Sequence, residues 1–170
     1  MRRSFAVAVL AAALAGAAVS AVASGATGHP AVSLRSTPLG SVLVAGNGRT
    51  LYLFTADRKT SACTGPCAAL WPPLLAKGSP TAGAGVKSSL LGTVKRLDGT
   101  RQVTYAGHPL YFFAPDARAG QTKGEGIVHF GGKWFVLSPL GMKVVAVKTS
   151  GGTVVKPPTT TTNSNGGYGK

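Results

Sequence analysis

The residues best suited to chemistry are few, and two of them recur in one pattern. Asp57 and Asp116 stand three residues after Phe54 and Phe113, at the ends of two aromatic runs. Paired carboxylates could hold a cation or work as acid and base, as in glycosidases, whose carboxyls lie about 5–9.5 Å apart in a sugar-sized cleft. An aspartate at a strand end also bonds local N–H groups or a tyrosine hydroxyl. Because the chain has only 4 acidic residues, we favour the structural role and predict no catalytic residue and no enzyme activity.

The two cysteines, Cys63 and Cys67, flank a Gly-Pro turn. Three residues separate them, whereas thioredoxin-type redox pairs are separated by two. Outside the cytosol such a pair most simply forms a structural disulfide. We therefore predict a Cys63–Cys67 disulfide, with metal ligation or redox cycling as the alternatives. Closing so short a loop contributes about 2 kcal/mol, so the bond would pin the turn without building the fold.

The histidines do not have the spacing of a dedicated metal or haem motif. His29 lies near the N-terminus, His129 lies in a short apolar run, and His108 stands where an otherwise similar segment has Arg49. We therefore predict no metal and no cofactor. A haem or copper site that uses histidines and Met142 remains the alternative from another functional class.

The segments that must position these residues are those of an antiparallel all-β domain over residues 38–148. Pairs of apolar runs flank short turn sequences, which favours β-hairpins. The turns are expected at Gly46-Asn47-Gly48, Asp98-Gly99, Ala106-Gly107 and Gly131-Gly132. The one helical candidate is Cys67 to Trp71, which Pro72 and Pro73 must stop.

Two of the expected strands are apolar on both faces. In Leu51 to Phe54 and in Leu110 to Phe113, aromatic and aliphatic side chains alternate. Such strands belong in the middle of a core. Trp71, Trp134 and Phe135 add to the aromatic area, of which each ring buries about 150–250 Å².

These strands belong to a repeat. Gly48 to Asp57 aligns without gaps on Gly107 to Asp116 at an offset of 59 residues, and a tryptophan, Trp71 or Trp134, follows each copy. Two copies predict two halves related by a pseudo-two-fold axis in one small domain, since a solenoid needs about three repeats or more.

The repeat places a tyrosine and an aspartate five residues apart, as in Tyr52 and Asp57. In one extended strand they would lie about 17 Å apart on opposite faces, so they meet only if the chain turns after Phe54 or Phe113. Either each tyrosine bonds the aspartate of its own copy, or the halves exchange partners. The sequence leaves both arrangements open.

These motifs resemble the bacterial "secreted repeat of unknown function" proteins, predicted lipoproteins with a Tyr-x-(Phe/Trp/Tyr)-x-x-Asp motif. The residues that fit the motif are Tyr52, Phe54, Asp57, Tyr111, Phe113 and Asp116. Cys63 to Cys67 with Trp71 to Leu74, and Asp98 to Tyr105, are also similar to that family. The resemblance covers about Thr37 to Pro139. It implies an envelope or extracellular address and no catalytic residue. The lipid-anchored cysteine of many members has no counterpart here.

Both ends of the chain are expected to lie outside the domain. Arg2-Arg3, the apolar run from Phe5 to Ala18 and Ala21-Val22-Ala23 predict a signal peptide over residues 1–23. The run is shorter than the roughly 20 residues of a membrane-spanning helix, so no transmembrane segment is expected after cleavage. Residues 24–37 are predicted to be a flexible lead-in, and the Thr-, Pro- and Gly-rich residues 149–170 a disordered tail.

The chain is strongly basic, with 18 Lys+Arg against 4 Asp+Glu and a net charge of +14. Without Arg2 and Arg3 the charge is 16 − 4 = +12. Scattered positive charge favours polyanions, or secures solubility only. Because the Arg/Lys-aromatic clusters that read bases are lacking, we predict no nucleic-acid partner. The sequence thus predicts a secreted or cell-wall-associated, non-enzymatic binding or structural module whose partners are anionic wall or surface polymers.

Overall fold

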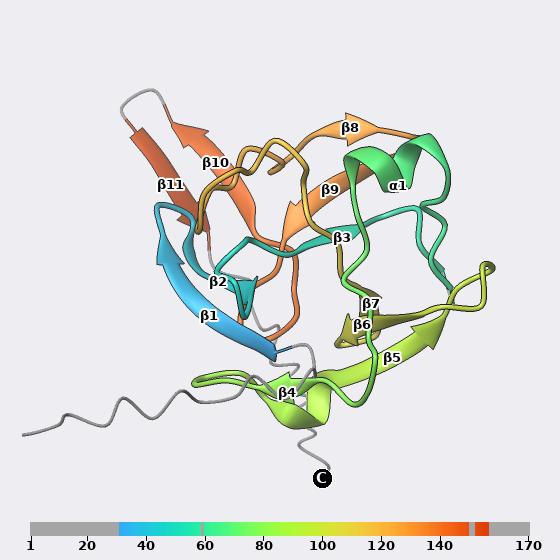
Figure 1. Cartoon of the computed structure of the whole chain (residues 1–170). Coiled ribbons are helices and arrows are strands. Elements are labelled where there is room, and N and C mark those ends of the chain that lie inside the picture. The colour runs from blue at the N-terminus through green and yellow to red at the C-terminus, as the bar shows by residue number, and fades with distance from the viewer. Residues whose placement is uncertain (1–30, 59, 150–151, 157–170) are drawn as a thin grey trace, which may run out of the picture.

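The structure is a computed structural model that describes residues 31–58, 60–149 and 152–156. Its strands form three three-stranded sheets, of orders β2-β1-β4, β3-β9-β8 and β5-β6-β7, and a β10-β11 pair. The strands are β1 (Ala31–Thr37), β2 (Gly40–Ala45), β3 (Tyr52–Phe54), β4 (Thr81–Ala82), β5 (Leu91–Lys95), β6 (Arg101–Tyr105), β7 (His108–Pro109), β8 (Val128–His129), β9 (Gly132–Val136), β10 (Val145–Thr149) and β11 (Gly152–Lys156). Within the described residues the pairing is antiparallel except where β1 meets β4. The predicted all-β class is confirmed (Figure 1).

The helical turns are short. Helix α1 (Pro66–Leu70) begins at a proline, whose fixed φ suits the first helical position and whose missing N–H is not needed there. It ends one residue before Trp71, whose amide donates to the Cys67 carbonyl at 2.7 Å, and Pro72 prevents continuation. A 3₁₀ turn, η1 (Ser88–Leu90), precedes β5.

Turn chemistry fixes the tight hairpins. Ala106-Gly107 joins β6 to β7 and Phe130-Gly131 joins β8 to β9, and all four residues have positive φ, between 50° and 81°. Two such residues in succession make the mirror-image turn that suits the twist of paired strands. The second loop was expected at Gly131-Gly132. It lies one residue earlier because Gly132 pairs with His129 as the first residue of β9.

The core has two layers on either side of the repeated strands. Tyr52, Phe54, Tyr111 and Phe113 point into one hydrophobic cluster together with both tryptophans. Leu51, Leu53, Leu110 and Phe112 contact the other cluster, which Val32, Leu43, Phe135 and Leu137 complete. The prediction that these strands are covered on both faces is confirmed.

The two copies of the repeat meet at equivalent residues. The amide of Tyr52 donates to the carbonyl of Tyr111 at 2.8 Å, and the amide of Tyr111 donates to the carbonyl of Tyr52 at 3.0 Å. On their outer sides Tyr52 pairs with Val136 and Tyr111 pairs with Pro73. The order Pro73–Tyr111–Tyr52–Val136 is therefore symmetric, as expected for a pseudo-two-fold axis between the tyrosines.

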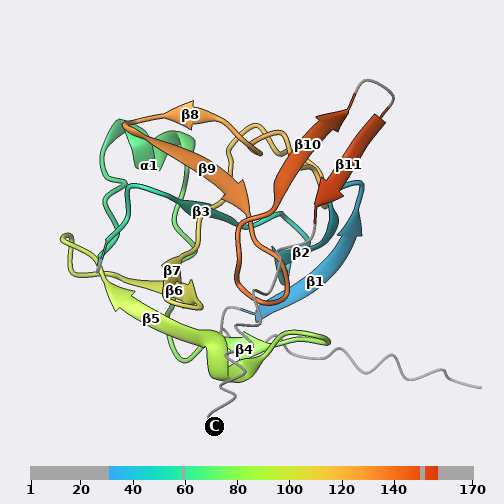
Figure 2. The ribbon, with the colours of Figure 1, turned by 180° about the vertical axis from the view of Figure 1, so that it is seen from behind.

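Each half is completed by the end of the other half. The Thr55 amide donates to the carbonyl of Lys133, and the equivalent Ala114 amide donates to that of Leu70, both at 2.9 Å. Figure 1 and the reverse view in Figure 2 show β9, from the second half, beside β3, from the first. The halves are thus interlocked, and neither half alone contains a complete set of strand partners.

Two predicted boundaries are corrected. Residues 31–37, assigned to a flexible lead-in, form β1, which pairs with β2 from Val32↔Ala45 to Thr37↔Gly40. Thr149 and residues 152–156, assigned to the disordered tail, take part in the β10–β11 hairpin, where β-branched residues favour extended backbone. The predicted signal peptide, residues 24–30 and residues 157–170 lie outside the described residues.

The role of β1 can be tested at Val32, which is fully buried. Truncating Val32→Ala should lower the free energy of unfolding by about 2 kcal/mol, because it removes apolar contacts and leaves a cavity. Urea titration monitored by tryptophan fluorescence measures this change. Ser36→Ala, at an exposed position of the same strand, should stay within about 0.5 kcal/mol of the wild type. Equal stability of Val32→Ala and the wild type would mean that this segment is a lead-in after all.

Candidate functional site

The two repeated tyrosines exchange their aspartates. The Tyr52 hydroxyl donates to Asp116 Oδ2 at 2.6 Å, and the Tyr111 hydroxyl lies 2.9 and 3.1 Å from the two carboxylate oxygens of Asp57. Of the two arrangements that the sequence left open, the structure therefore has the exchanged one. Each pair ties the aromatic strand of one half to the turn that ends the strand of the other half.

A turn after each strand places the aspartates. The Asp57 amide donates to the Phe54 carbonyl at 3.2 Å, and the Asp116 amide donates to the Phe113 carbonyl at 3.0 Å. Each carboxylate also accepts a backbone N–H from the following loop, Ala62 at 2.7 Å for Asp57 and Lys123 at 3.1 Å for Asp116. The aspartates thus hold their own loops as well as the opposite tyrosines.

Glycine allows one of these loops to approach. The Gly124 amide donates to the Tyr52 hydroxyl at 3.3 Å. A Cβ at Gly124 would lie 2.8 Å from Cη2 of Trp71 and 3.0 Å from Cε1 of Tyr52, closer than packed carbon atoms lie. The loop that covers the Tyr52–Asp116 pair therefore needs a glycine at this position.

The aromatic residues of the repeats form a continuous stack. Trp71 and Trp134 lie face to face with centroids 3.9 Å apart and planes 4° apart. Phe54 stacks on Trp134 at 4.1 Å, and Phe113 stacks on Trp71 at 4.2 Å. Tyr52 and Tyr111 meet Trp71 and Trp134 edge-on, at 5.4 and 5.2 Å. Each phenylalanine thus stacks on the tryptophan of the other half, which repeats the exchange seen in the hydrogen bonds.

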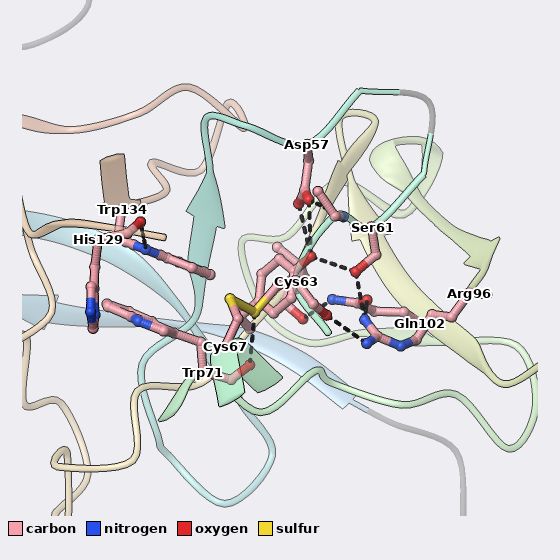
Figure 3. The surroundings of a disulfide bond; sticks show 12 residues. Asp57, Ser61, Cys63, Cys67, Trp71, Arg96, Gln102, His129 and Trp134 are labelled. Carbon is pink, nitrogen blue, oxygen red and sulfur yellow. Dashed lines mark hydrogen bonds between the residues drawn. A yellow bond between two sulfur atoms is a disulfide. The ribbon is translucent and has the colours of Figure 1, made fainter. Parts of the chain in front are cut away.

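The disulfide lies beside this stack. Cys63 and Cys67 are bonded to each other and buried, which confirms the prediction. Figure 3 shows the tryptophans on one side of the disulfide and a polar network around Arg96 on the other. The Arg96 guanidinium donates to the Cys63 carbonyl at 2.7 Å, to Ser61 Oγ at 2.5 Å and to Gln102 Oε1 at 2.6 Å.

The Arg96 network continues to the repeated motif. The Ser61 hydroxyl lies 2.6 Å from the Tyr111 hydroxyl, and Gln102 Nε2 donates to the Leu110 carbonyl at 2.8 Å. Asp98 Oδ2 lies 3.5 Å from Arg96 Nε. Arg96 is 5% exposed, so these partners are required to compensate its desolvation. The network joins the disulfide loop, the β5–β6 hairpin and Tyr111.

Sequence reasoning missed Ser61, Arg96, Gln102 and Glu125. Gln102 sits at a polar position of an alternating strand, a pattern that predicts exposure, yet it is fully buried. Glu125 Oε2 accepts the amide of Val136 at 2.7 Å. The residue of the first half that is equivalent to Val136 is Pro73, which has no N–H group. Only the second half therefore needs a carboxylate acceptor at this place. Nothing in the local sequence marked these four residues.

Burial shifts the acidic groups upward. It raises the pKa of Asp57 to about 6, against the lowering effects of the Ala62 amide, the Tyr111 hydroxyl and Arg96. It raises the pKa of Glu125 to about 7, against the Val136 amide, and also raises the pKa of Asp116. The pKa values of Tyr52 and Tyr111 are raised by burial and by the carboxylates beside them. The phenols therefore remain neutral donors.

The two histidines within the described residues, His108 and His129, have different surroundings. His129, on β8, is exposed and stacks on Phe130 with centroids 3.9 Å apart. His108, on β7, lines a surface pocket together with Met142 and Asp57. In the described part of the chain, no three His, Cys, Asp or Glu side chains cluster in a way that could hold a metal ion.

Double-mutant cycles test the exchanged pairing. Tyr52→Phe and Asp116→Asn should each lower the free energy of unfolding by about 1–3 kcal/mol, because each leaves a buried polar group short of a partner. The double variant should cost less than the sum of the two. Tyr52→Phe combined with Asp57→Asn is the matched control and should be additive to within about 0.5 kcal/mol. Coupling in the control cycle instead of the exchanged one would contradict the structure.

The raised pKa of Glu125 predicts a pH effect. A carboxyl whose pKa is higher in the folded state favours folding below its unfolded value, here 4.5, and that contribution is lost as the pH rises through about 7. Wild type should therefore lose stability relative to Glu125→Gln between about pH 5 and pH 8, as measured by denaturant titration. The comparison with the variant is needed because other groups titrate in the same range: the raised pKa of Asp57 acts in the same direction as that of Glu125, and the lowered pKa of His108 acts in the opposite direction. A stability difference that is constant with pH would show that Glu125 does not titrate in this range.

A family profile matches both halves of the chain. The family described as "secreted repeat of unknown function" matches residues 33–75, which include β2, β3 and α1, and residues 92–138, which include β6 to β9. No curated protein and no solved structure matches the chain. None of the helices in the described residues has the length and hydropathy of a membrane span. The two matched segments confirm the resemblance found in the motifs, and the chain belongs to the family of secreted repeats of unknown function.

Proposed function

We propose that this protein is a non-catalytic binding module of the cell envelope or its surroundings, which holds anionic polymers on its surface. The observation that carries the proposal is the separation of charge between interior and exterior. Asp116 is buried, Asp57 and Glu125 are half-buried, and all three accept internal hydrogen bonds. Asp98 is the remaining acid of the chain, and it pairs with Arg96.

Most of the cations whose burial is described, in contrast, face solvent. Among the residues whose burial is described, ten Lys and Arg side chains are exposed: Arg35, Arg58, Lys77, Lys87, Lys95, Arg101, Arg118, Lys123, Lys133 and Lys143. With three of the four acids turned inward, little negative charge remains to neutralise them locally. Such a surface attracts polyanions and accelerates encounters with them.

One surface cleft combines these cations with hydroxyl groups. It has a volume of about 510 Å³, and its lining includes Lys77, Ser88, Thr93 and Arg101. The β5–β6 hairpin forms one side and the chain after Leu75 forms the other, joined by the Ala76 amide, which donates to the Arg101 carbonyl at 2.8 Å. Thr93 Oγ1 accepts hydrogen bonds from Nε and Nη2 of Arg101 and so orients this guanidinium. The remaining guanidinium N–H groups, the Lys77 ammonium and the Ser88 hydroxyl suit phosphate or carboxylate oxygens. This cleft is therefore the part of the surface to which we assign the polymer.

Salt dependence tests the proposal. Binding of the mature protein to a phosphodiester wall polymer should weaken linearly on a log–log plot against salt. The double variant Lys77→Gln/Arg101→Gln should reduce the magnitude of this slope by about two. For each cation that the protein lacks, binding releases about one counterion fewer from the polymer. The matched control, Lys123→Gln with Lys133→Gln, removes two exposed cations outside the cleft.

Three results would count against the proposal. Binding that is unchanged between about 50 and 200 mM salt would reduce the positive charge to a solubility device. Equal affinity for a neutral glucan would remove the electrostatic basis. An equal reduction of the slope in the control variant would show that the polymer does not bind specifically in the cleft.

A further inference from the structure

One of the positions at which the two copies of the repeat differ faces the strand of the other half. In the first half this position is Arg49, whose Nη2 donates to the Phe113 carbonyl at 3.0 Å. The Arg49 guanidinium carbon also lies 4.6 Å from the centroid of the Phe112 ring. The guanidinium therefore fills the space beside the strand end that leads to Asp116.

In the second half the same position is His108, and the same space is open. The pseudo-two-fold places His108 opposite Leu53 and Phe54, the counterparts of Phe112 and Phe113. All three line a pocket of about 440 Å³. Histidine is shorter than arginine, so the volume that a guanidinium fills in one half is a cavity in the other. Arg49 in the first half is therefore a precedent for a guanidinium at the equivalent place in the second half.

The pocket lining contains one acidic residue and one lysine, Asp57 and Lys143. Asp57, the counterpart of Asp116, lines it and supplies a carboxylate, and Phe54 and Leu53 supply apolar surface. Met142 and the exposed Lys143 also line it. The Lys143 Nζ lies 5.4 Å from the centroid of the Phe135 ring. The Lys143 ammonium repels a ligand that carries only positive charge, but it attracts a ligand that also carries a carboxylate.

We propose that this pocket binds a cationic amino acid, with the guanidinium of the ligand in the place that Arg49 takes in the other half and the ligand carboxylate toward Lys143. The planar guanidinium matches a carboxylate and a carbonyl oxygen as acceptors. The pocket volume lies in the range of about 300–1,000 Å³ that is usual for small-molecule sites. Its lining does not include Lys77 or Arg101, so this site is independent of the polymer cleft.

The ligand chemistry is tested with three probes by isothermal calorimetry. L-Arginine should bind saturably at one site per chain. L-Citrulline has the same shape but a neutral ureido group, and it should bind at least about tenfold more weakly, because it lacks the charge-assisted hydrogen bonds. Agmatine, which lacks the carboxylate, should also bind more weakly than arginine. Citrulline binding as tight as arginine, or no saturable arginine binding, overturns the proposal.

The site is tested with variants that the repeat itself suggests. His108→Arg should fill the pocket as Arg49 fills its counterpart, and arginine binding should fall at least tenfold while the melting temperature is maintained. Lys143→Gln should bring the affinity for arginine down to that for agmatine. Lys95→Gln is the control, because Lys95 is an exposed lysine of β5 that does not line the pocket. Undiminished arginine binding by folded His108→Arg would refute the location, and a loss in the Lys95→Gln control equal to that in Lys143→Gln would refute the role of Lys143.

Discussion

The fold depends on one constraint: the side-chain hydrogen-bond partner of each of the two repeated tyrosines, Tyr52 and Tyr111, lies in the other half of the chain. Tyr52 and Tyr111 exchange backbone bonds with each other, and their hydroxyls reach Asp116 and Asp57 across the pseudo-two-fold axis. A buried phenol without an acceptor costs about 1–3 kcal/mol. Neither half can therefore satisfy its own polar groups, and the aromatic stack, in which Trp71 lies against Trp134, forms only when the halves meet.

The same constraint separates the charges that we associate with function. A domain with only 4 acidic residues uses Asp57, Asp116 and Glu125 to anchor loops and strands from within. The carboxylates that hold the fold are consequently withdrawn from the surface, which is left to lysine and arginine. The positive exterior is thus linked to how the interior is built, and a substitution that exposes an inner aspartate should alter both stability and polymer binding.

Local patterns predicted much of the fold, and long-range contacts explain the rest. Alternation and turn residues predicted the hairpins and the doubly buried strands at Leu51 to Phe54 and Leu110 to Phe113. The choice between own and exchanged aspartates depends on contacts between residues 54 or 64 positions apart, which periodicity does not encode. Arg96 donates to the Cys63 carbonyl in the disulfide loop and Gln102 pairs with Leu75, so the burial of both residues depends on segments distant in the sequence. In β1, Val32 and Leu34 alternate with polar residues over too short a span to predict a strand.

Native-state hydrogen exchange tests the interlocking of the halves most directly. The amides of Tyr52 and Tyr111 donate to each other's carbonyls on the pseudo-two-fold axis. If the halves depend on each other, both amides exchange only through global unfolding, and their opening free energies are equal to each other and to the free energy of unfolding measured by denaturant. A Tyr111 amide that exchanges through a much smaller opening free energy than the Tyr52 amide, or the reverse, would show that one half stays folded without the other and would contradict this account.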